Sequence, residues 1–296
     1  MTPPNNYSWS FRRGELYHGI VYSMKLKCVH RDPQSPMMML ALRRASAAAG
    51  LTAAAACVQH RKTSECFFWR KAAEPSPTLS SRDFVLAPYG VLGERLTRDR
   101  RLVAMAPEPR DGVALVDPAG LDCIQLFGPS AAGAASGAIY YFLGIHREWS
   151  FPADVVEAVH APGLAKHHAY TLADGATAHC IHTVGPNFNE PSDNGEDTRE
   201  DAVARLAAAY VAVLTEFDSI GAETLRLLPI SGGVFAGPWQ GEIAALTRDA
   251  IDAACAALPE PVAERLGAEG CRLELCIFAE DEWEEFVGMG FAEPSS

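Results

Sequence analysis

The sequence has no long hydrophobic run. Its most apolar stretches, residues 138–145 and 207–214, are far shorter than the roughly 20 apolar residues that a membrane-spanning helix needs. We therefore expect no membrane partner. With 48% hydrophobic and 21% charged residues, the composition is that of an ordinary folded protein, which excludes a collagen-like or largely disordered chain. The 296 residues suffice for two domains, or for one α/β domain with an extension.

The eight cysteines lack the paired spacing of a zinc site, because none belongs to a CxxC pair. Cys180, Cys255 and Cys276 lie in apolar strand or helix patterns, where a thiol acts as a small hydrophobic group. We expect reduced cysteines, no metal and no cofactor. The expected location is intracellular, either cytoplasmic or, with a cleaved N-terminal transit peptide, organellar.

Positive charge is scarce beyond residue 83. Residues 1–83 contain twelve Lys or Arg and five Asp or Glu, a net charge of +7, so residues 84–296 carry −19 and the whole chain −12. Such an acidic body repels phosphate backbones at long range, and we expect no sequence-specific nucleic-acid partner. A nucleotide would have to be held by local chemistry.

The first 83 residues do not have the pattern of a domain. Their apolar residues come in clumps, such as 37–40 and 53–56, and a Pro- and Ser-rich run follows at 72–82. The basic, Ala-rich stretch after Met39 matches an organelle-targeting peptide, and the alternatives are a disordered extension or a gene start assigned too early. We predict a basic, low-complexity extension over 1–83 and a folded domain over 84–296.

Strand and helix patterns alternate after this extension. Strands are predicted at 113–116, 178–184, 225–230 and 273–278, and helices at 136–143, 152–160, 198–217, 241–257 and from 281. The long helix begins with a capping-box pattern at Thr198 and Asp201. This alternation predicts an α/β fold, a three-layer α/β/α sandwich with a mixed, mainly parallel sheet.

Three glycine-containing turns follow predicted strands, at 127–137, 182–186 and 229–238. In a sheet covered on both faces, ligands bind outside the carboxyl ends of the strands. Small residues at a helix N-terminus, and a Gly-Gly pair such as 232–233, let backbone amides approach an anion. Taken singly, the first turn is equally well interpreted as a packing device, and the turn at 229–238 as a plain strand-to-helix connection with Phe235 in the core.

Together the three turns resemble the macro domain, a family that binds ADP-ribose and related nucleotides. The resemblance covers roughly residues 100–288. Residues 181–186 (IHTVGP) are similar to the family's Ile-His-x-Val-Gly-Pro pattern, and 228–238 (LPISGGVFAGP) to its Pro-x-Ile-Ser-x-Gly-x-Tyr/Phe-Gly-x-Pro loop. Residues 133–139 (GAASGAI) stand where the family has Gly-Gly-Val-Asp-Gly-Ala-Ile. The order and spacing of all three agree.

The resemblance implies a ligand diphosphate clasped from two sides by backbone amides. It also implies that Phe235 lies against the distal ribose and that Phe278 packs on adenine, although an ordinary buried strand residue is the alternative for Phe278. The implied binding residues are Gly133, Ala134, Ala135, Ser136, Ser231, Gly232, Gly233, Val234, Phe235 and Phe278. The implied partner is ADP-ribose or an ADP-ribosylated protein.

The sequence departs from the hydrolytic members of this family at their catalytic positions. Their Val-Asn-Ala-Ala-Asn is replaced by Val-Asp-Pro-Ala-Gly at 116–120, and the Asp implicated in water activation by Ser136. Gly120 has no side chain, and a neutral hydroxyl is a poor general base. Asp117 is the remaining catalytic candidate, with a role as a turn acid before Pro118 as the alternative.

Two further groups of polar residues stay open. The family's Gly-Asp-Ile signature for the adenine amine is absent, with Glu108 and Asp111 as candidate substitutes. The histidines at 167, 168, 179 and 182 lie close in sequence, but strand periodicity separates neighbours onto opposite faces. We therefore expect no metal site among them, and we expect His182 to be buried and hydrogen-bonded to the backbone.

These observations favour a module that binds ADP-ribose or ADP-ribosyl groups, with hydrolysis slow or absent. The alternative is an ADP-ribosyl ester hydrolase or an ADP-ribose phosphate phosphatase with a non-standard catalytic apparatus. A third possibility is a scaffold that has lost the ligand. The missing Asn and Asp favour binding over hydrolysis, and the preserved loops disfavour the scaffold.

Overall fold

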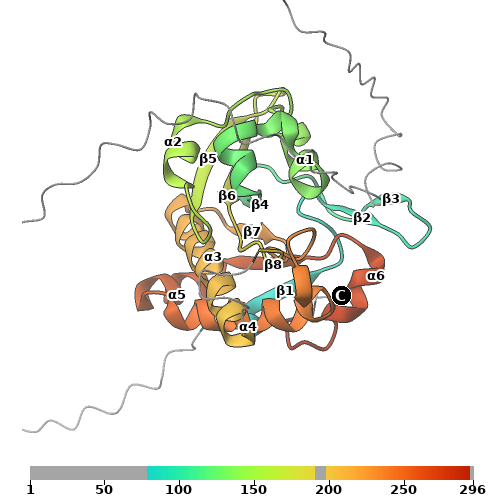
Figure 1. Ribbon diagram of the computed structural model, residues 1–296, viewed down its shortest axis with the longest axis vertical. Helices are drawn as coiled ribbons and strands as arrows, with labels where there is room; N and C mark the ends of the chain where they lie inside the picture. Colours follow the sequence, from blue (N-terminus) through green and yellow to red (C-terminus); the bar gives the residue numbers. More distant parts are fainter. Residues whose placement is uncertain (1–78, 191–197, 294–296) are drawn as a thin grey trace, which may run out of the picture. The chain divides into compact units, whose positions relative to one another are not determined.

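The structure is a computed structural model that describes residues 79–190 and 198–293. The chain divides into two units, Met1–Ala73 and Glu74–Ser296, and all described residues belong to the second unit. Within them, six strands form one sheet in the order β1-β8-β7-β4-β6-β5 (Figure 1). These strands are β1 (Phe84–Ala87), β4 (Val113–Pro118), β5 (Ala165–Thr171), β6 (Thr177–Thr183), β7 (Thr224–Leu227) and β8 (Arg272–Cys276).

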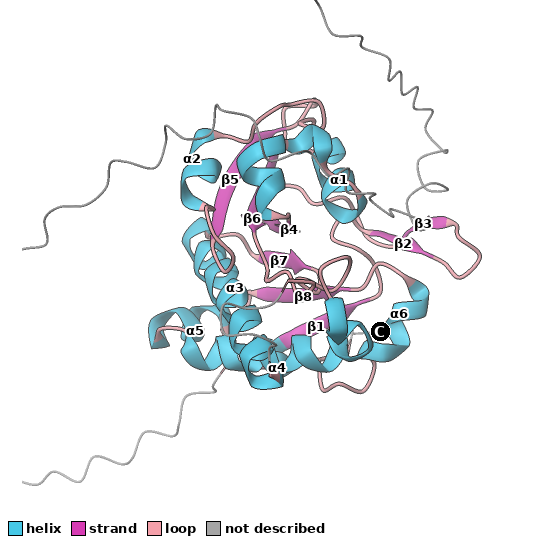
Figure 2. Ribbon diagram, in the orientation of Figure 1, coloured by secondary structure: helices cyan, strands magenta, loops and turns pink. Residues whose placement is uncertain are grey.

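The sheet is mixed and mainly parallel. All neighbouring strands run parallel except the edge strand β5, which runs antiparallel to β6. Helices lie on both faces (Figure 2). The predicted fold class is therefore confirmed.

The two faces carry separate hydrophobic cores. Helices α1 (Ala134–Phe142) and α2 (Ala153–Ala158) contribute to the smaller core. Helices α3 (Arg199–Ile220), α4 (Ile243–Ala257), α5 (Glu260–Leu266) and α6 (Glu280–Phe286) contribute to the larger one. In β4, Ala114 and Val116 belong to the larger core and Leu115 to the smaller, because successive strand side chains point to opposite faces.

Local signals in the sequence set both ends of α3. The backbone N–H of Asp201 donates to the Thr198 hydroxyl at 3.2 Å, and the Asp201 carboxylate accepts the backbone N–H of Thr198 in return. This capping box satisfies donors that the first helical turn leaves free. The helix ends at Gly221, whose φ of 71° is a left-handed conformation that favours glycine. The capping box predicted from the sequence at Thr198 and Asp201 is therefore confirmed as the start of α3.

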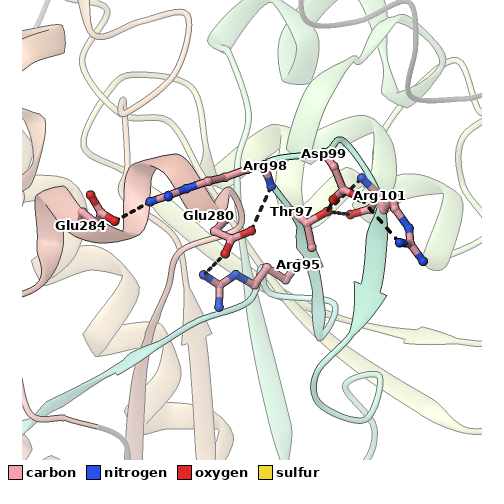
Figure 3. Close-up of polar contacts among 7 residues, drawn as sticks. All are labelled: Arg95, Thr97, Arg98, Asp99, Arg101, Glu280 and Glu284. Carbon is pink, nitrogen blue, oxygen red and sulfur yellow. Dashed lines mark hydrogen bonds and ion pairs between the residues drawn. The ribbon is translucent and has the colours of Figure 1, made fainter.

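A hairpin of β2 (Glu94–Leu96) and β3 (Leu102–Ala104) lies beside the carboxyl end of β8. The backbone N–H of Leu96 donates to the Phe278 carbonyl at 2.9 Å. Ion pairs then join the hairpin to α6: Arg95 contacts Glu280 at 3.6 Å and Arg98 contacts Glu284 (Figure 3). The hairpin is therefore fixed to the start of α6.

The folded unit is already packed at Leu79. This side chain is only 3% exposed within the larger core, and the backbone N–H of Ser81 donates to Asp252 of α4 at 2.8 Å. The boundary expected at 83/84 falls after these contacts, and the expected extension over 1–78 lies outside the described residues. In the described part of the chain, no helix is both long and apolar enough to cross a membrane.

Candidate functional site

The carboxyl ends of β4 and β7 meet at one edge of the sheet. After β4 the chain forms β5 and β6, which lie on one side of β4 in the sheet. After β7 it forms β8, which lies on the opposite side. The direction of winding reverses between these adjacent strands, and ligands bind at such switch points in α/β sheets. The candidate site is formed by the loop after β4, residues 119–133 (the first loop), and the loop after β7, residues 228–236 (the second loop).

The first loop ends in unsatisfied amides at the start of α1. Gly133 is the N-cap residue, and no side chain caps this helix. Among the described residues, none accepts the backbone N–H of Gly133, Ala134, Ala135 or Ser136. A Cβ at Gly133 would meet no atom within 4 Å, so the loop is open at this point. Such amides, together with the helix dipole, attract an anion.

The second loop offers a further set of amides. Gly233 is exposed, and a Cβ there would meet nothing within 4 Å, whereas a Cβ at Gly232 would lie 2.9 Å from the Pro229 carbonyl oxygen. In the described part of the chain, the backbone N–H groups of Gly233, Val234 and Phe235 have no hydrogen-bond acceptor. Gly232 is thus required for the tight turn, and Gly233 keeps the amides accessible.

Two residues of the site are in the left-handed backbone region, one at the start of α1 and one in the second loop. Ala134 has a φ of 51° and Ser231 a φ of 59°, and neither is a glycine. Such conformations cost free energy and persist where the surroundings enforce them, often at ligand sites. The Ser231 hydroxyl donates to the Pro186 carbonyl at 2.7 Å, which helps to enforce the second of them.

The segment after β6 braces the second loop. The backbone N–H of Phe188 donates to the Phe235 carbonyl at 2.9 Å, and the Asn189 side-chain amide donates to the Val234 carbonyl at 2.7 Å. A Cβ at Gly185 would lie 2.4 Å from the Ser231 hydroxyl, which explains the glycine of the strand-end motif. Asn189 was not predicted, and its only signal in the sequence is its place just after that motif.

The first and second loops touch at Gly120 and Phe235. A Cβ at Gly120 would lie 3.1 Å from Cζ of Phe235, closer than most carbon contacts in proteins. The aromatic ring therefore takes the space that a side chain at position 120 would use. Phe278 follows β8 at the same edge of the sheet, and its ring lies against Gly90, where a Cβ would come within 3.0 Å of Cδ2.

Asp117 lies beneath the first loop and has no exposed surface. Its Oδ2 accepts a hydrogen bond from Tyr140 of α1 at 2.6 Å and lies 2.8 Å from Nδ1 of His182. Nε2 of His182 in turn lies 2.8 Å from the Tyr170 hydroxyl. The catalytic candidate is thus enclosed in the smaller core, where it cannot touch a ligand between the loops.

Asp117, His182 and Tyr170 are linked in the order carboxylate, imidazole, hydroxyl, as in a catalytic triad, but this buried arrangement does not provide an active nucleophile. Tyr170 occupies the nucleophile position, but only 7% of it is exposed and burial raises the pKa of its hydroxyl far above the usual value. His182 is buried as expected, but the partners of its ring nitrogens among residues 79–190 and 198–293 are the Asp117 and Tyr170 side chains rather than the backbone.

The candidate substitutes for the adenine-contacting Asp lie at the other edge of the sheet. Asp111 precedes β4 and accepts the backbone N–H of Thr177, the first residue of β6, at 3.3 Å. Glu108 pairs with Arg110 at 3.1 Å, and Arg110 also pairs with Asp174 in the turn before β6. The carboxylates of Glu108 and Asp111 are therefore engaged by Arg110 and by the backbone of Thr177.

Two of the histidines face each other across β5 and β6. Nε2 of His167 lies 3.0 Å from Nδ1 of His179, with the rings stacked at 5.1 Å between centroids. Burial, together with the nearby His179, lowers the pKa of His167 to about 4. The described residues contain no group of three or more His, Cys, Asp or Glu arranged to hold a metal ion.

Solved structures of similar fold include a macrodomain of Oceanobacillus iheyensis with ADP, at 16% identity and a TM-score of 0.42, covering 70% of this chain and 90% of that one. The chain is similar to macrodomains. A Trypanosoma brucei macrodomain in complex with ADP has 19% identity and a TM-score of 0.41, covering 69% and 68%. At these identities the similarity concerns the fold alone.

A structure of alphavirus P23pro-zbd is also similar, with 18% identity and a TM-score of 0.37 over 58% of this chain. The chain spans about a fifth of that protein, 20% of its length. No family model matches the sequence, and no curated protein matches it.

Proposed function

We propose that the first and second loops, at the carboxyl ends of β4 and β7, together bind ADP-ribose or an ADP-ribosyl group. The observation that carries the proposal is the pair of open amide clusters, at 133–136 and 233–235, on the two sides of the switch point. Amides at a helix N-terminus and successive amides in a glycine turn both bind phosphate oxygens. A diphosphate matches two such clusters, and it needs no lysine or arginine.

Aromatic side chains support the assignment of the two ends of the ligand. Phe235, in contact with Gly120, provides a ring at the first loop for the distal ribose. Phe278, held against Gly90 and the β2–β3 hairpin, provides a second ring along the same edge for the base. The motif resemblance at 181–186 and 228–238 supports adenine nucleotides among the possible diphosphates.

Hydrolysis is slow or absent in this proposal. General base catalysis contributes about 10²- to 10⁴-fold to a rate, but it needs a proton acceptor within hydrogen-bond reach of the attacking water. Ser136 offers a neutral hydroxyl, Gly120 offers no side chain, and Asp117 is enclosed beneath the loop. The site therefore acts as a reader of ADP-ribosylated protein.

Calorimetric titration with ADP-ribose tests the binding, and ADP, the ligand of the Oceanobacillus and Trypanosoma structures, serves as a second probe. Gly233→Val fills the open side of the second loop, and we expect it to weaken binding at least tenfold with an unchanged Tm. Gly241→Val is the matched control, because a Cβ there is equally unobstructed but lies outside the loop. No binding by the unmodified protein would indicate a scaffold.

A hydrolysis assay separates the reader from the alternative enzyme. A peptide ADP-ribosylated on an acidic side chain and ADP-ribose phosphate serve as the two substrates. We expect binding of ADP-ribose without measurable turnover of either substrate. Rapid turnover by the unmodified protein would instead support a hydrolase or phosphatase that activates water by a non-standard route.

A further inference from the structure

One hydrogen bond joins the side chains of α1 to the sheet. The Tyr140 hydroxyl donates to Oδ2 of Asp117 at 2.6 Å, and both residues are fully buried. Within the described residues, no other side-chain hydrogen bond runs from α1 to a strand. Bonds to an ionised carboxylate are shorter and stronger than neutral ones, and burial in an apolar core strengthens them further.

The sheet holds the acceptor of this bond in place. Asp117 on β4 and His182 on β6 are register partners, and His182 is bonded in turn to Tyr170 on β5. Both ring nitrogens of His182 therefore have a partner, Nδ1 at the Asp117 carboxylate and Nε2 at the Tyr170 hydroxyl. The Phe151 ring packs edge-on against Tyr140 and His182, at 5.3 Å and 5.2 Å between centroids. The acceptor oxygen is therefore fixed by three neighbouring strands.

The start of α1 has no comparable restraint. Its N-cap is a glycine without a side-chain bond, no acidic residue lies in its first turn, and Ala134 is in the left-handed region. Apolar packing along the rest of the helix is non-directional, whereas a hydrogen bond has a preferred length and angle. Tyr140 lies six residues after Ala134, about 9 Å along the helix axis at about 1.5 Å per residue.

We propose that Tyr140 and Asp117 are positioning residues for the anion site at the start of α1. This inference rests on the proposed function, and neither side chain touches the ligand. The directional bond fixes the helix along its axis, so that the amides of 133–136 stay aligned with those of the second loop. Recognition of this kind requires alignment to within about 0.5 Å.

Tyr140→Phe removes the bond and keeps the ring. It also leaves the buried Asp117 carboxylate with His182 as its one donor, since Oδ1 already has no partner in the described part of the chain. We expect the Kd for ADP-ribose to rise about tenfold. Tyr141→Phe is the matched control, because Tyr141 is the next residue of the same helix, 57% exposed. Its Kd should stay within twofold of the unmodified protein.

Hydrogen exchange of the backbone amides of 137–143 gives a second readout that needs no ligand. We expect faster exchange in Tyr140→Phe than in Tyr141→Phe. A wild-type Kd and wild-type exchange in Tyr140→Phe would overturn the inference. If the unmodified protein does not bind ADP-ribose, the proposed function fails, and the exchange comparison still decides whether the bond positions α1.

A milder variant covers the case in which Tyr140→Phe does not fold. Asp117→Asn keeps an acceptor oxygen for Tyr140 but removes the charge that strengthens the bond. We expect exchange of 137–143 to be faster than in Tyr141→Phe. Exchange identical to that control would contradict the positioning role.

Discussion

At the scale of single residues, Gly120 and Phe235 form a complementary pair. The sequence shows only that a side chain is missing at 120, whereas the structure shows that the Phe235 ring occupies the adjoining space. We therefore expect that Gly120→Asn with Ser136→Asp does not create a hydrolase, because a side chain at 120 must first displace the Phe235 ring.

Gly120→Ala should weaken ADP-ribose binding by a few fold, because the added Cβ would lie 3.1 Å from Cζ of Phe235 and the ring must move. Phe235→Leu makes room, so the double variant should lose less affinity than the sum of the two single changes. A double-mutant cycle on Kd measures this coupling, and we expect at least about 0.5 kcal/mol, as found for residues in contact. Additive effects would mean that the two loops respond independently.

At the scale of elements, Glu274 links β8 to two neighbouring segments. The carboxylate is 3% exposed and accepts hydrogen bonds from Arg226 of β7 at 3.0 Å, from Arg272 at 2.6 Å and from Tyr89 after β1 at 3.1 Å. Burial, together with the Glu274 charge, raises the pKa of Tyr89 to about 12. The pair of Arg98 and Glu284 between the hairpin and α6 is, by contrast, 62% and 75% exposed.

Glu274→Gln should lower the free energy of unfolding by about 3 kcal/mol, because it leaves the buried Arg226 guanidinium without a counter-charge. Glu284→Gln breaks an exposed pair and should cost less than about 1 kcal/mol. Urea denaturation of both variants measures the difference. Equal losses would show that burial does not govern the strength of these pairs.

Comparison of the individual helices and strands shows which of them sequence patterns alone could predict. The capping box and amphipathic pattern predicted α3, and apolar runs predicted β4, β6, β7 and β8. Strand β5 was not predicted, because Ala-Lys-His-His-Ala-Tyr-Thr has no apolar alternation and lies at the sheet edge. The glycine loops were predicted as a site from their motifs. The burial of Asp117 was not predicted from the sequence, because it depends on Tyr140, which lies 23 residues away in sequence.

At the scale of the whole molecule, His167 makes one contribution to stability depend on pH, because it takes up a proton more readily in the unfolded chain than in the folded one. Its pKa is lowered from 6.5 to about 4, chiefly by burial and then by His179. Between these values His167 binds more protons in the unfolded chain than in the folded one. Its contribution to stability is therefore complete above pH 6.5 and is lost as the pH falls toward 4. The carboxyl groups of Asp154 and Asp249, with pKa values lowered from 3.8, contribute below this window.

His167→Gln should make the free energy of unfolding less dependent on pH. We expect the loss between pH 7 and pH 5 to shrink by about 1 kcal/mol, a figure that allows for solvent screening of this half-buried side chain. Chemical denaturation at the two pH values measures the change, and His160→Gln, an exposed histidine, is the control. An identical loss in His167→Gln and in the unmodified protein would mean that other groups take up the protons.

The last described residues of the chain close the outer edge of β1. The backbone N–H of Ala292 donates to the Phe84 carbonyl at 2.9 Å, and the Ala292 carbonyl accepts from Leu86 at 2.8 Å. The edge that an extended foreign segment would otherwise pair with is thereby covered. The first and last elements of the folded unit are also neighbours in space. A circular permutant could join residue 293 to residue 79 by a short linker and open the chain at the turn 173–175. It would leave the described strands and both the first and the second loop uncut.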